Sequence, residues 1–368
     1  MSIQKFNRGD VAEGVLGATL TAKFINRPKT LKDRNVVVTK AMVDKVLDDF
    51  YKKTKLVSYK VNDIAVKRGK TSIDNVNFSI NLPTAAAELL SVKKNRNIVD
   101  DLYDSAIAYV EKTWSDEVMM FALNGQIDKI DIISDGVGDQ KGTKADIKIT
   151  VNGKPHSRQI SLKVAGGEQF AQVSGDDFSK QQKLWEDVLK LDISNLEKKY
   201  NKALEKYDKT KVFSSRDDVK LNAFKDMIKT AAGVVYKEAA VQMQAKISAK
   251  DNTFFTNFAN LVFMGATKGE KSIELVKLEQ RKFKQLRFNK DFVKLYSEQL
   301  KKSKLIAKFS TTGDPIVRIY SGSESKNNLI LQIRTKVEAA SKTTKAGKVY
   351  TPYMRNYVEA GPLMFNLL

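Results

Sequence analysis

Apolar residues recur at helical spacing over much of the first third of the chain. This periodicity predicts helices over residues 9–24, 39–53 and 97–124, and Asp10 stands where the N-cap of the first helix is expected. Between the second and third helices, apolar and polar residues alternate within 58–82, which predicts strand and loop.

Alternation dominates the middle of the chain. The isoleucine-rich segment 127–133 is predicted to be a strand, and alternation of apolar and polar residues over 145–151 and 158–164 predicts two more. A glycine-rich loop at 135–142 separates the first two strands, and a helical stretch is expected at 168–173 after the third.

The second half is predicted to be mostly helical. Long helical patterns cover 178–211 and 217–250, and later strands are expected at 273–278, 315–320 and 329–336. The chain is therefore predicted to be a mixed α/β (α+β) protein. Its 368 residues suggest two domains, or one elaborated domain.

The counts of cysteine, histidine and charged residues exclude several kinds of active site and indicate the charge of a partner. The chain has no cysteine, which excludes disulfides, thiolate metal sites and cysteine nucleophiles. Its one histidine, His156, excludes reactions that need two imidazoles. The 64 Lys and Arg residues against 43 Asp and Glu residues give a net charge of +21. Nucleic acid is the commonest partner of such a surplus, and a solubility surface or an acidic protein partner is the alternative interpretation.

No segment is expected to enter a membrane. Residues 1–6 contain no apolar signal core, and the longest apolar stretch, 254–266, is short and carries two asparagines. We therefore expect a cytoplasmic protein without a membrane partner.

One short stretch concentrates the residues that phosphodiester hydrolysis needs. Asp146 lies in one predicted strand, and Ser161 and Lys163 share one face of the next, because side chains alternate along a strand. The reaction needs a divalent cation that stabilises the developing charge and activates water. A carboxylate can hold such an ion, and a nearby lysine can orient or deprotonate the water.

This order of elements, with Asp146 followed by Ser161-Leu162-Lys163, resembles the PD-(D/E)xK nuclease superfamily, which has the restriction-endonuclease-like fold. The resemblance implies a nuclease-like core of a mixed sheet flanked by helices at 1–175. A mostly helical, basic region with a few strands would follow at 176–368. It also implies Mg²⁺ or Mn²⁺ as the cofactor, Asp146 as a metal ligand, and Lys163 as the residue that positions the attacking water.

The sequence departs from the superfamily pattern at Ser161, where an acidic metal ligand is expected. In the junction-resolvase-like branch, a glutamate on the first helix reaches into the site, and Glu13 matches it. Gln169 and Gln172 stand where related nucleases place a glutamine on the helix after the lysine strand. The resemblance thus implies Glu13 as the second metal ligand, and Ser161, Gln169 and Gln172 as further site residues.

The pairing of the two motif strands depends on the loop between them. A tight turn at Asn152-Gly153 would pair Asp146 with Gln159, whereas a wider loop would pair Asp146 with Lys163. Pro155 favours the wider loop, because proline disfavours continuous ladder pairing.

Three neighbouring polar residues have two interpretations each. Asp135 and Asp139 precede the Asp146 strand and could ligate a metal ion, although loop capping explains them more simply. His156 is expected to be an exposed loop residue rather than a general base.

The resemblance thus implies a metal-dependent endonuclease, restriction-like or junction-resolvase-like, that hydrolyses DNA and belongs to a bacteriophage or a restriction system. Ser161 favours the alternative of a catalytically inactive DNA-binding protein of the same fold. A basic structural or assembly protein of a phage is another alternative, and it predicts that Asp146 and Lys163 point to different places. Because cutting two strands usually takes two sites, a homodimer is expected, although no residue shows it.

Overall fold

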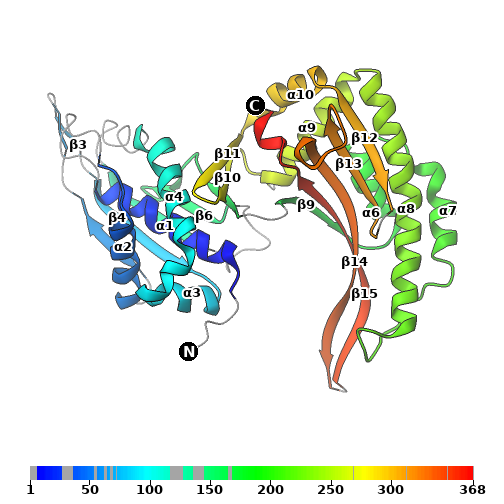
Figure 1. Ribbon diagram of the computed structural model, residues 1–368, viewed down its shortest axis with the longest axis horizontal. Coiled ribbons are helices and arrows are strands. Elements are labelled where there is room, and N and C mark those ends of the chain that lie inside the picture. Colours follow the sequence, from blue (N-terminus) through cyan, green and yellow to red (C-terminus); the bar gives the residue numbers. More distant parts are fainter. Residues whose placement is uncertain are drawn as a thin grey trace. The chain divides into compact units, whose positions relative to one another are not determined.

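The computed structural model describes residues 6–26, 36–53, 56–61, 64–66, 69–71, 73–116, 127–135, 145–164, 168–267, 269–311, 313–345 and 347–367. Within these ranges the protein is a mixed α/β protein, as the sequence predicts, with helices packed on two mixed or antiparallel sheets (Figure 1). The chain forms two compact units, Met1–Gly166 with Glu270–Phe288, and Gly167–Gly269 with Asn289–Leu368.

The first unit differs in extent from the nuclease-like core expected at 1–175. It ends at Gly166 and takes back the hairpin of β10 (Ile273–Glu279) and β11 (Lys282–Phe288) from the second half of the chain. The hairpin returns because β10 pairs in parallel with β8 (Ile160–Val164), the strand that carries Lys163.

The sheet of the first unit runs in the order β1-β4-β5-β6-β8-β10-β11, with β7 paired to β6. Its remaining strands are β1 (Val57–Lys60), β4 (Ile73–Asn81), β5 (Ile127–Asp135), β6 (Ile147–Val151) and β7 (Lys154–Pro155). The β4–β5 and β8–β10 pairs are parallel and the other pairs are antiparallel. A separate small ribbon is formed by β2 (Ile64–Val66) and β3 (Gly69–Thr71).

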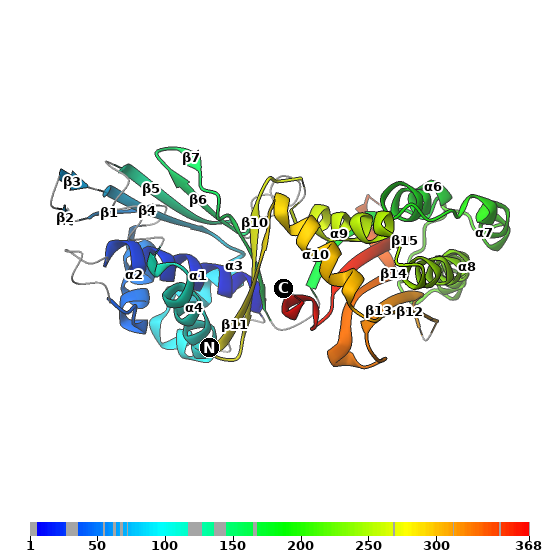
Figure 2. The same cartoon turned by 90° about the horizontal axis from the view of Figure 1, so that it is seen from above.

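Helix α1 (Arg8–Ile25) is the centre of this unit, since every residue from Val11 to Phe24 is buried. Helices α2 (Lys40–Lys53), α3 (Thr84–Ser91) and α4 (Asp100–Thr113) pack around it, and Figure 2 shows the helices on one face of the sheet. The predicted first helix is confirmed, but its N-cap is Asn7, whose side chain accepts from the backbone N–H of Gly9. The prediction of Asp10 as the cap was therefore wrong.

Two contacts bring α1 close to the end of β5. A Cβ on Gly17 would lie 2.2 Å from the hydroxyl oxygen of Ser134, so only glycine permits this approach. The Ser134 hydroxyl also donates to the backbone carbonyl of Glu13 at 2.8 Å. The glycine and the serine together fix where the Glu13 turn of α1 meets the sheet.

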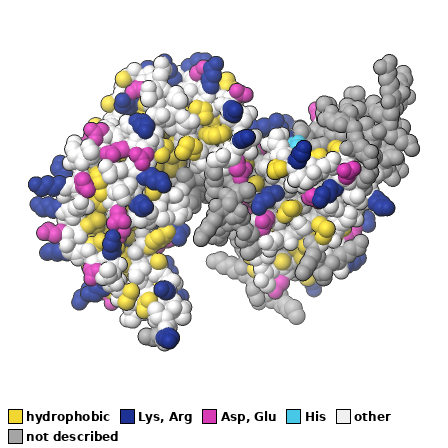
Figure 3. Space-filling model, turned by 180° about the vertical axis from the view of Figure 1, so that it is seen from behind, with side chains coloured by type: hydrophobic (Ala, Val, Ile, Leu, Met, Phe, Trp, Pro, Cys, Tyr) yellow, Lys and Arg dark blue, Asp and Glu magenta, His cyan; other side chains and the backbone are white. Residues whose placement is uncertain are grey.

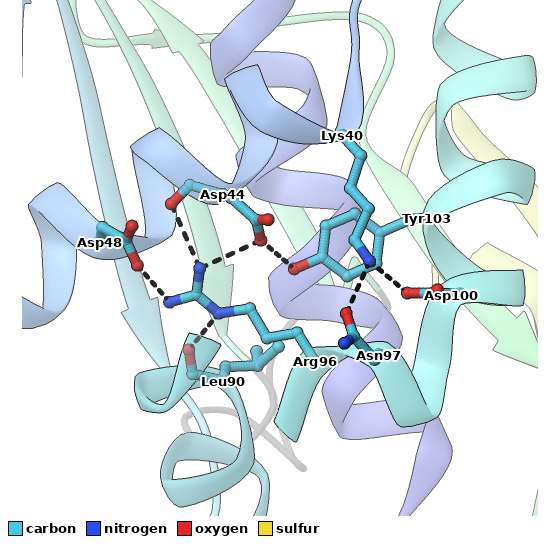
Figure 4. Close-up of polar contacts among 8 residues, drawn as sticks. All are labelled: Lys40, Asp44, Asp48, Leu90, Arg96, Asn97, Asp100 and Tyr103. Atoms are coloured by element: carbon cyan, nitrogen blue, oxygen red, sulfur yellow. Dashed lines mark hydrogen bonds and ion pairs between the residues drawn. The ribbon is translucent and has the colours of Figure 1, made fainter. Parts of the chain in front are cut away.

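A fully buried guanidinium joins the surrounding helices (Figure 4). Arg96, in the 3-10 helix η1 (Lys93–Val99), pairs with Asp44 and Asp48 on α2 and donates to the carbonyl of Leu90. Asp44 also accepts from the hydroxyl of Tyr103 on α4. Because the partners lie on α2, α3 and α4, this network fixes α2 against α3 and α4.

The second unit is built on an antiparallel sheet in the order β12-β13-β14-β15-β9. Its strands are β12 (Leu305–Ser310), β13 (Ile316–Ser321), β14 (Leu329–Thr344), β15 (Gly347–Ala360) and β9 (Glu168–Ser174). The long helix α8 (Val219–Ser248) packs on this sheet, and α9 (Asn252–Thr267) and α10 (Lys290–Lys302) pack on each other. Short 3-10 helices lie at η4 (Lys326–Asn328) and η5 (Met364–Asn366).

Three predicted helices differ in the structure. The stretch expected at 168–173 is the strand β9, because it hydrogen-bonds along β15. The helix expected at 97–124 is α4 in its described part, and residues 117–126 lie outside the described residues. The helix expected at 178–211 is broken where Lys190 adopts a φ of 56°. Its pieces are α6 (Phe178–Gln182), the π-helix η2 (Lys183–Val188), η3 (Ser194–Leu196) and α7 (Glu197–Ala203).

Candidate active site

Asp146 is held at the entry to β6 by both its backbone and its side chain. Its backbone N–H donates to the carbonyl of Ile160, and its carbonyl accepts from the N–H of Asp135. Its Oδ2 atom accepts from the backbone N–H of Leu162 at 2.5 Å and from the hydroxyl of Ser161 at 3.2 Å. The carboxylate therefore has a fixed orientation against β8.

Lys163 reaches the same carboxylate from β8. Its Nζ lies 3.7 Å from Oδ2 of Asp146, and it donates to the carbonyl of Leu162 at 2.9 Å and to the hydroxyl of Ser161 at 3.4 Å. About a quarter of each charged side chain is exposed, 23% for Lys163 and 26% for Asp146. The pair is thus open to a solvent-borne ligand.

Ser161, which replaces the expected acidic ligand, is fully buried. Its hydroxyl donates to Asp146 and accepts from Lys163, so it links the two charged groups. In this position it orients the pair and supplies no negative charge of its own.

The strand register that produces this contact matches neither predicted pairing. The tight turn forms, since Asn152 and Gly153 both have positive φ and Val151 pairs with Lys154. Further along, however, Ile147 pairs with Ile160, which sets Asp146 opposite Ser161.

A side chain causes the shift in register. The amide of Gln159 accepts from the backbone N–H of Ile149 and donates to the carbonyls of Ile149 and His156. The carbonyl of Ile149 also accepts from the backbone N–H of His156, so the register of the tight turn continues to this point. The Gln159 amide bonds the remaining backbone groups there, and the chain gains two residues before Ile147 pairs with Ile160. His156 is half-buried beside the ring of Trp114, so the prediction that it is an exposed loop residue was wrong.

Glu13 brings a second carboxylate from α1. The residue is 8% exposed, and its Oε2 is buried without a hydrogen-bond partner among the described residues. Burial, followed by the negative charges of Asp146 and Asp10, raises the pKa of Glu13 to about 9, while the Lys163 charge acts in the opposite direction. The structure therefore places Glu13 within electrostatic reach of both motif residues.

Asp10 was missed as a candidate site residue. It precedes Glu13 by three positions, so both side chains lie on one face of α1. Burial and the charge of Asp146 raise the pKa of Asp10. The sequence signal that could have found it is the Asp10-x-x-Glu13 spacing at the start of a helix.

Asp135 also contributes to the field at Glu13, but its own carboxylate has protein partners. It accepts from the side-chain amide of Asn81 at 2.9 Å and from the Nζ of Lys148 at 3.2 Å. Asp139, the other alternative ligand, lies outside the described residues.

The two predicted glutamines do not lie on a helix after the lysine strand. Gln169 and Gln172 are on β9, opposite Glu359 and Tyr357 of β15, in the sheet of the second unit. The expectation was wrong because this segment joins a sheet whose other strands come more than 130 residues later.

The carboxyl groups of the site are of the kind that can bind a hard divalent cation. Oε2 of Glu13 is buried without a hydrogen-bond partner among the described residues, and the charges of Asp146 and Asp10 act on this group. Mg²⁺ is usually held by one or two carboxylates together with water, and Asp146 and Glu13 supply two. In the described parts of the chain, no three His, Cys, Asp or Glu side chains converge as a ready-made metal-ligand group.

Comparisons with protein-family models, with curated proteins and with solved structures gave no match. Among the helices that the structure describes, none is long and apolar enough to span a membrane.

Proposed function

We propose that the protein is a metal-dependent endonuclease that hydrolyses DNA phosphodiester bonds, with Mg²⁺ or Mn²⁺ as its cofactor. One observation carries the proposal: Lys163 meets Asp146 across two strands, and the charges of both act on the buried carboxyl of Glu13, whose Oε2 has no hydrogen-bond partner among the described residues. The net charge of +21 supports a polyanionic substrate.

The residues have separate roles in this proposal. Asp146 and Glu13 would hold the cation, which supplies charge stabilisation and water activation when bound. An ammonium group has three donors, and Leu162 and Ser161 accept two of those of Lys163. The third is left to hold a water or a phosphate oxygen beside Asp146.

A catalytically inactive DNA-binding protein is the second candidate. It is favoured by the two hydrogen bonds that Oδ2 of Asp146 accepts from Ser161 and Leu162 and by its ion pair with Lys163, because a carboxylate already satisfied by its own chain has less need of a metal ion. The third alternative, an assembly protein, predicts that Asp146 and Lys163 point apart, whereas they lie 3.7 Å apart.

Plasmid cleavage tests the proposal. Supercoiled DNA is incubated with Mg²⁺ or Mn²⁺ and with wild type, Asp146→Ala or Lys163→Ala. Asp128→Ala and Lys154→Ala are matched controls, since both residues are exposed in the same sheet. Nicking that both site variants lose and both controls keep, with folding intact by circular dichroism, supports the enzyme and its site together.

Two outcomes would contradict the proposal. Salt-sensitive DNA binding without cutting would favour the inactive protein, and cutting that survives both site variants would move the active site elsewhere.

A homodimer in the cytoplasm is the remaining part of the proposal. Light scattering with size-exclusion chromatography measures its oligomeric state.

A further inference from the structure

The second unit carries a two-stranded ribbon that extends past its own sheet (Figure 1). Strand β13 pairs with β14 only as far as Arg334, and β9 pairs with β15 only from Arg355 onward. From Lys336 to Thr344, β14 pairs with β15 alone. These nine residues span about 30 Å at ~3.3 Å per residue.

The outer part of this ribbon lacks a core. Residues 341–344 and 347–348 are exposed, whereas Val337, Pro352 and Met354, nearer the sheet, are buried. One contact outside the ribbon is a bridge between Phe213 and Tyr350. Isolated two-stranded hairpins are only marginally stable in water. The outer part of the ribbon therefore exposes both of its faces to solvent.

The end of the ribbon is basic. Lys342, Lys345 and Lys348 are exposed, and none has a carboxylate partner among the described residues. The only acidic residue beyond Lys336 on the ribbon is Glu338, which pairs with Lys336. Figure 3 shows blue side chains at the end of the ribbon.

The register distributes these charges on both faces. Lys342 lies opposite Val349, and Lys348 lies opposite Thr343. Because cross-strand partners share a face and neighbouring positions alternate, Lys342 and Lys348 project from opposite faces. Lys345 lies at the turn between them.

We propose that the β14–β15 ribbon is a DNA-contacting arm whose tip enters a groove of duplex DNA, with Lys342, Lys345 and Lys348 on the flanking phosphates. The major groove of B-DNA admits a two-stranded ribbon and has a phosphate backbone on each side, which matches cations on both faces. This role rests on the proposed function for the identity of the polymer, and it adds that the substrate is duplex.

A charge-matched pair of variants tests the arm. K342Q/K345Q/K348Q neutralises the tip, and K198Q/K199Q/K202Q removes three exposed lysines of α7 in the same unit. Binding of a fluorescent 30-base-pair duplex and of its single strand is measured against salt, in EDTA so that no metal-dependent cleavage occurs. We expect the ribbon variant to lose about tenfold or more in duplex affinity at low salt. The slope of log affinity against log salt should fall by about 2 to 3.

Three results would overturn the arm. The two triple variants could weaken binding equally, which would mean a general charge effect. Single-strand binding could fall as much as duplex binding. The ribbon variant could also bind duplex normally but self-associate. The lysines would then serve to prevent the exposed strand edges from pairing with another chain.

Cleavage assays separate this role from the proposed function. Ribbon-dependent duplex binding by a wild type that never cuts plasmid would leave the arm standing and the nuclease proposal refuted. Metal-dependent cutting by a ribbon variant that binds duplex like wild type would support the nuclease proposal and refute the arm.

Discussion

The Nζ of Lys163 lies 3.7 Å from Oδ2 of Asp146, although the strand ladder sets Asp146 opposite Ser161 rather than Lys163. The contact forms because Ser161 and Lys163 share one face of β8 and the Asp146 carboxylate leans onto that strand. The chemistry that we propose thus depends on side chains that reach along the strand direction.

The hydroxyl of Ser161, which connects Asp146 and Lys163, can be removed by a single small substitution. We expect Ser161→Ala to lower the single-turnover cleavage rate about fivefold to tenfold, because one buried hydrogen-bonded link is worth about 1 kcal/mol. Thr150→Val is the control, since Thr150 also donates to a carboxylate, that of Asp131 on the same sheet. An unchanged rate in Ser161→Ala would show that the hydroxyl does not orient the pair.

An acidic residue at position 161, as in the superfamily pattern, should strengthen metal binding. Ser161→Asp would add a carboxylate beside Lys163, so we expect Mn²⁺ to bind more tightly and the metal-free protein to be less stable. Isothermal titration and chemical denaturation in EDTA measure the two effects. Weaker Mn²⁺ binding in Ser161→Asp would place the cation away from this strand.

Glu13 should make stability depend on pH. Its folded pKa of about 9 lies above its usual value of 4.5, so the folded state holds a proton that the unfolded state has lost between these values. The stabilising effect is full below about pH 4.5 and is lost as pH rises through 9, with a slope of up to ~1.4 kcal/mol per unit. Urea denaturation in EDTA should therefore show a steeper decline for wild type than for Glu13→Gln. Parallel curves would contradict the burial of this carboxyl.

The buried Arg96 should be a main support of the first unit. Arg96→Ala leaves Asp44 and Asp48 without their cation, and we expect a loss of about 3–5 kcal/mol in the free energy of unfolding. Lys94→Ala, at an exposed position two residues away, is the control and should change little. A loss below 1 kcal/mol in Arg96→Ala would show that the network is not a structural support.

Gln159 should set the register of the motif strands. Gln159→Leu removes three hydrogen bonds to backbone groups of Ile149 and His156, and we expect about 2–3 kcal/mol of destabilisation with slower cleavage. Gln285→Leu, at an exposed position of β11, is the control. Normal cleavage in a folded Gln159→Leu variant would show that the register does not position Asp146.

Local patterns were enough to predict much of the first unit. Helix α1 and the strands β5, β6 and β8 follow from the spacing of apolar residues, which a buried face imposes. The sequence also brought Asp146 and Lys163 together on adjacent strands. The sequence could not predict the register of these two strands. The Gln159 side chain hydrogen-bonds backbone groups of Ile149 and His156, and an alternating pattern of residues does not reveal such bonds.

Long-range pairing explains the other errors. Residues 168–174 have no local feature that reveals β15, which lies about 180 residues later and makes β9 a strand. Strand β10 was predicted as a strand, but no local feature reveals that it pairs with β8 from the second half of the chain. Asp10 was assigned to a cap because local rules favour that role, whereas its proximity to Asp146 is a property of the packed helix.

Direct measurement of metal binding tests the central claim most closely. Mn²⁺ is titrated into metal-free protein and followed by electron paramagnetic resonance, with Asp146→Asn and Glu13→Gln as site variants and Asp128→Asn as control. The proposed site predicts one bound Mn²⁺ that both site variants weaken at least tenfold and the control keeps. Equal Mn²⁺ binding by all four proteins, or no binding by wild type, would contradict a metal-dependent active site at Asp146 and Glu13.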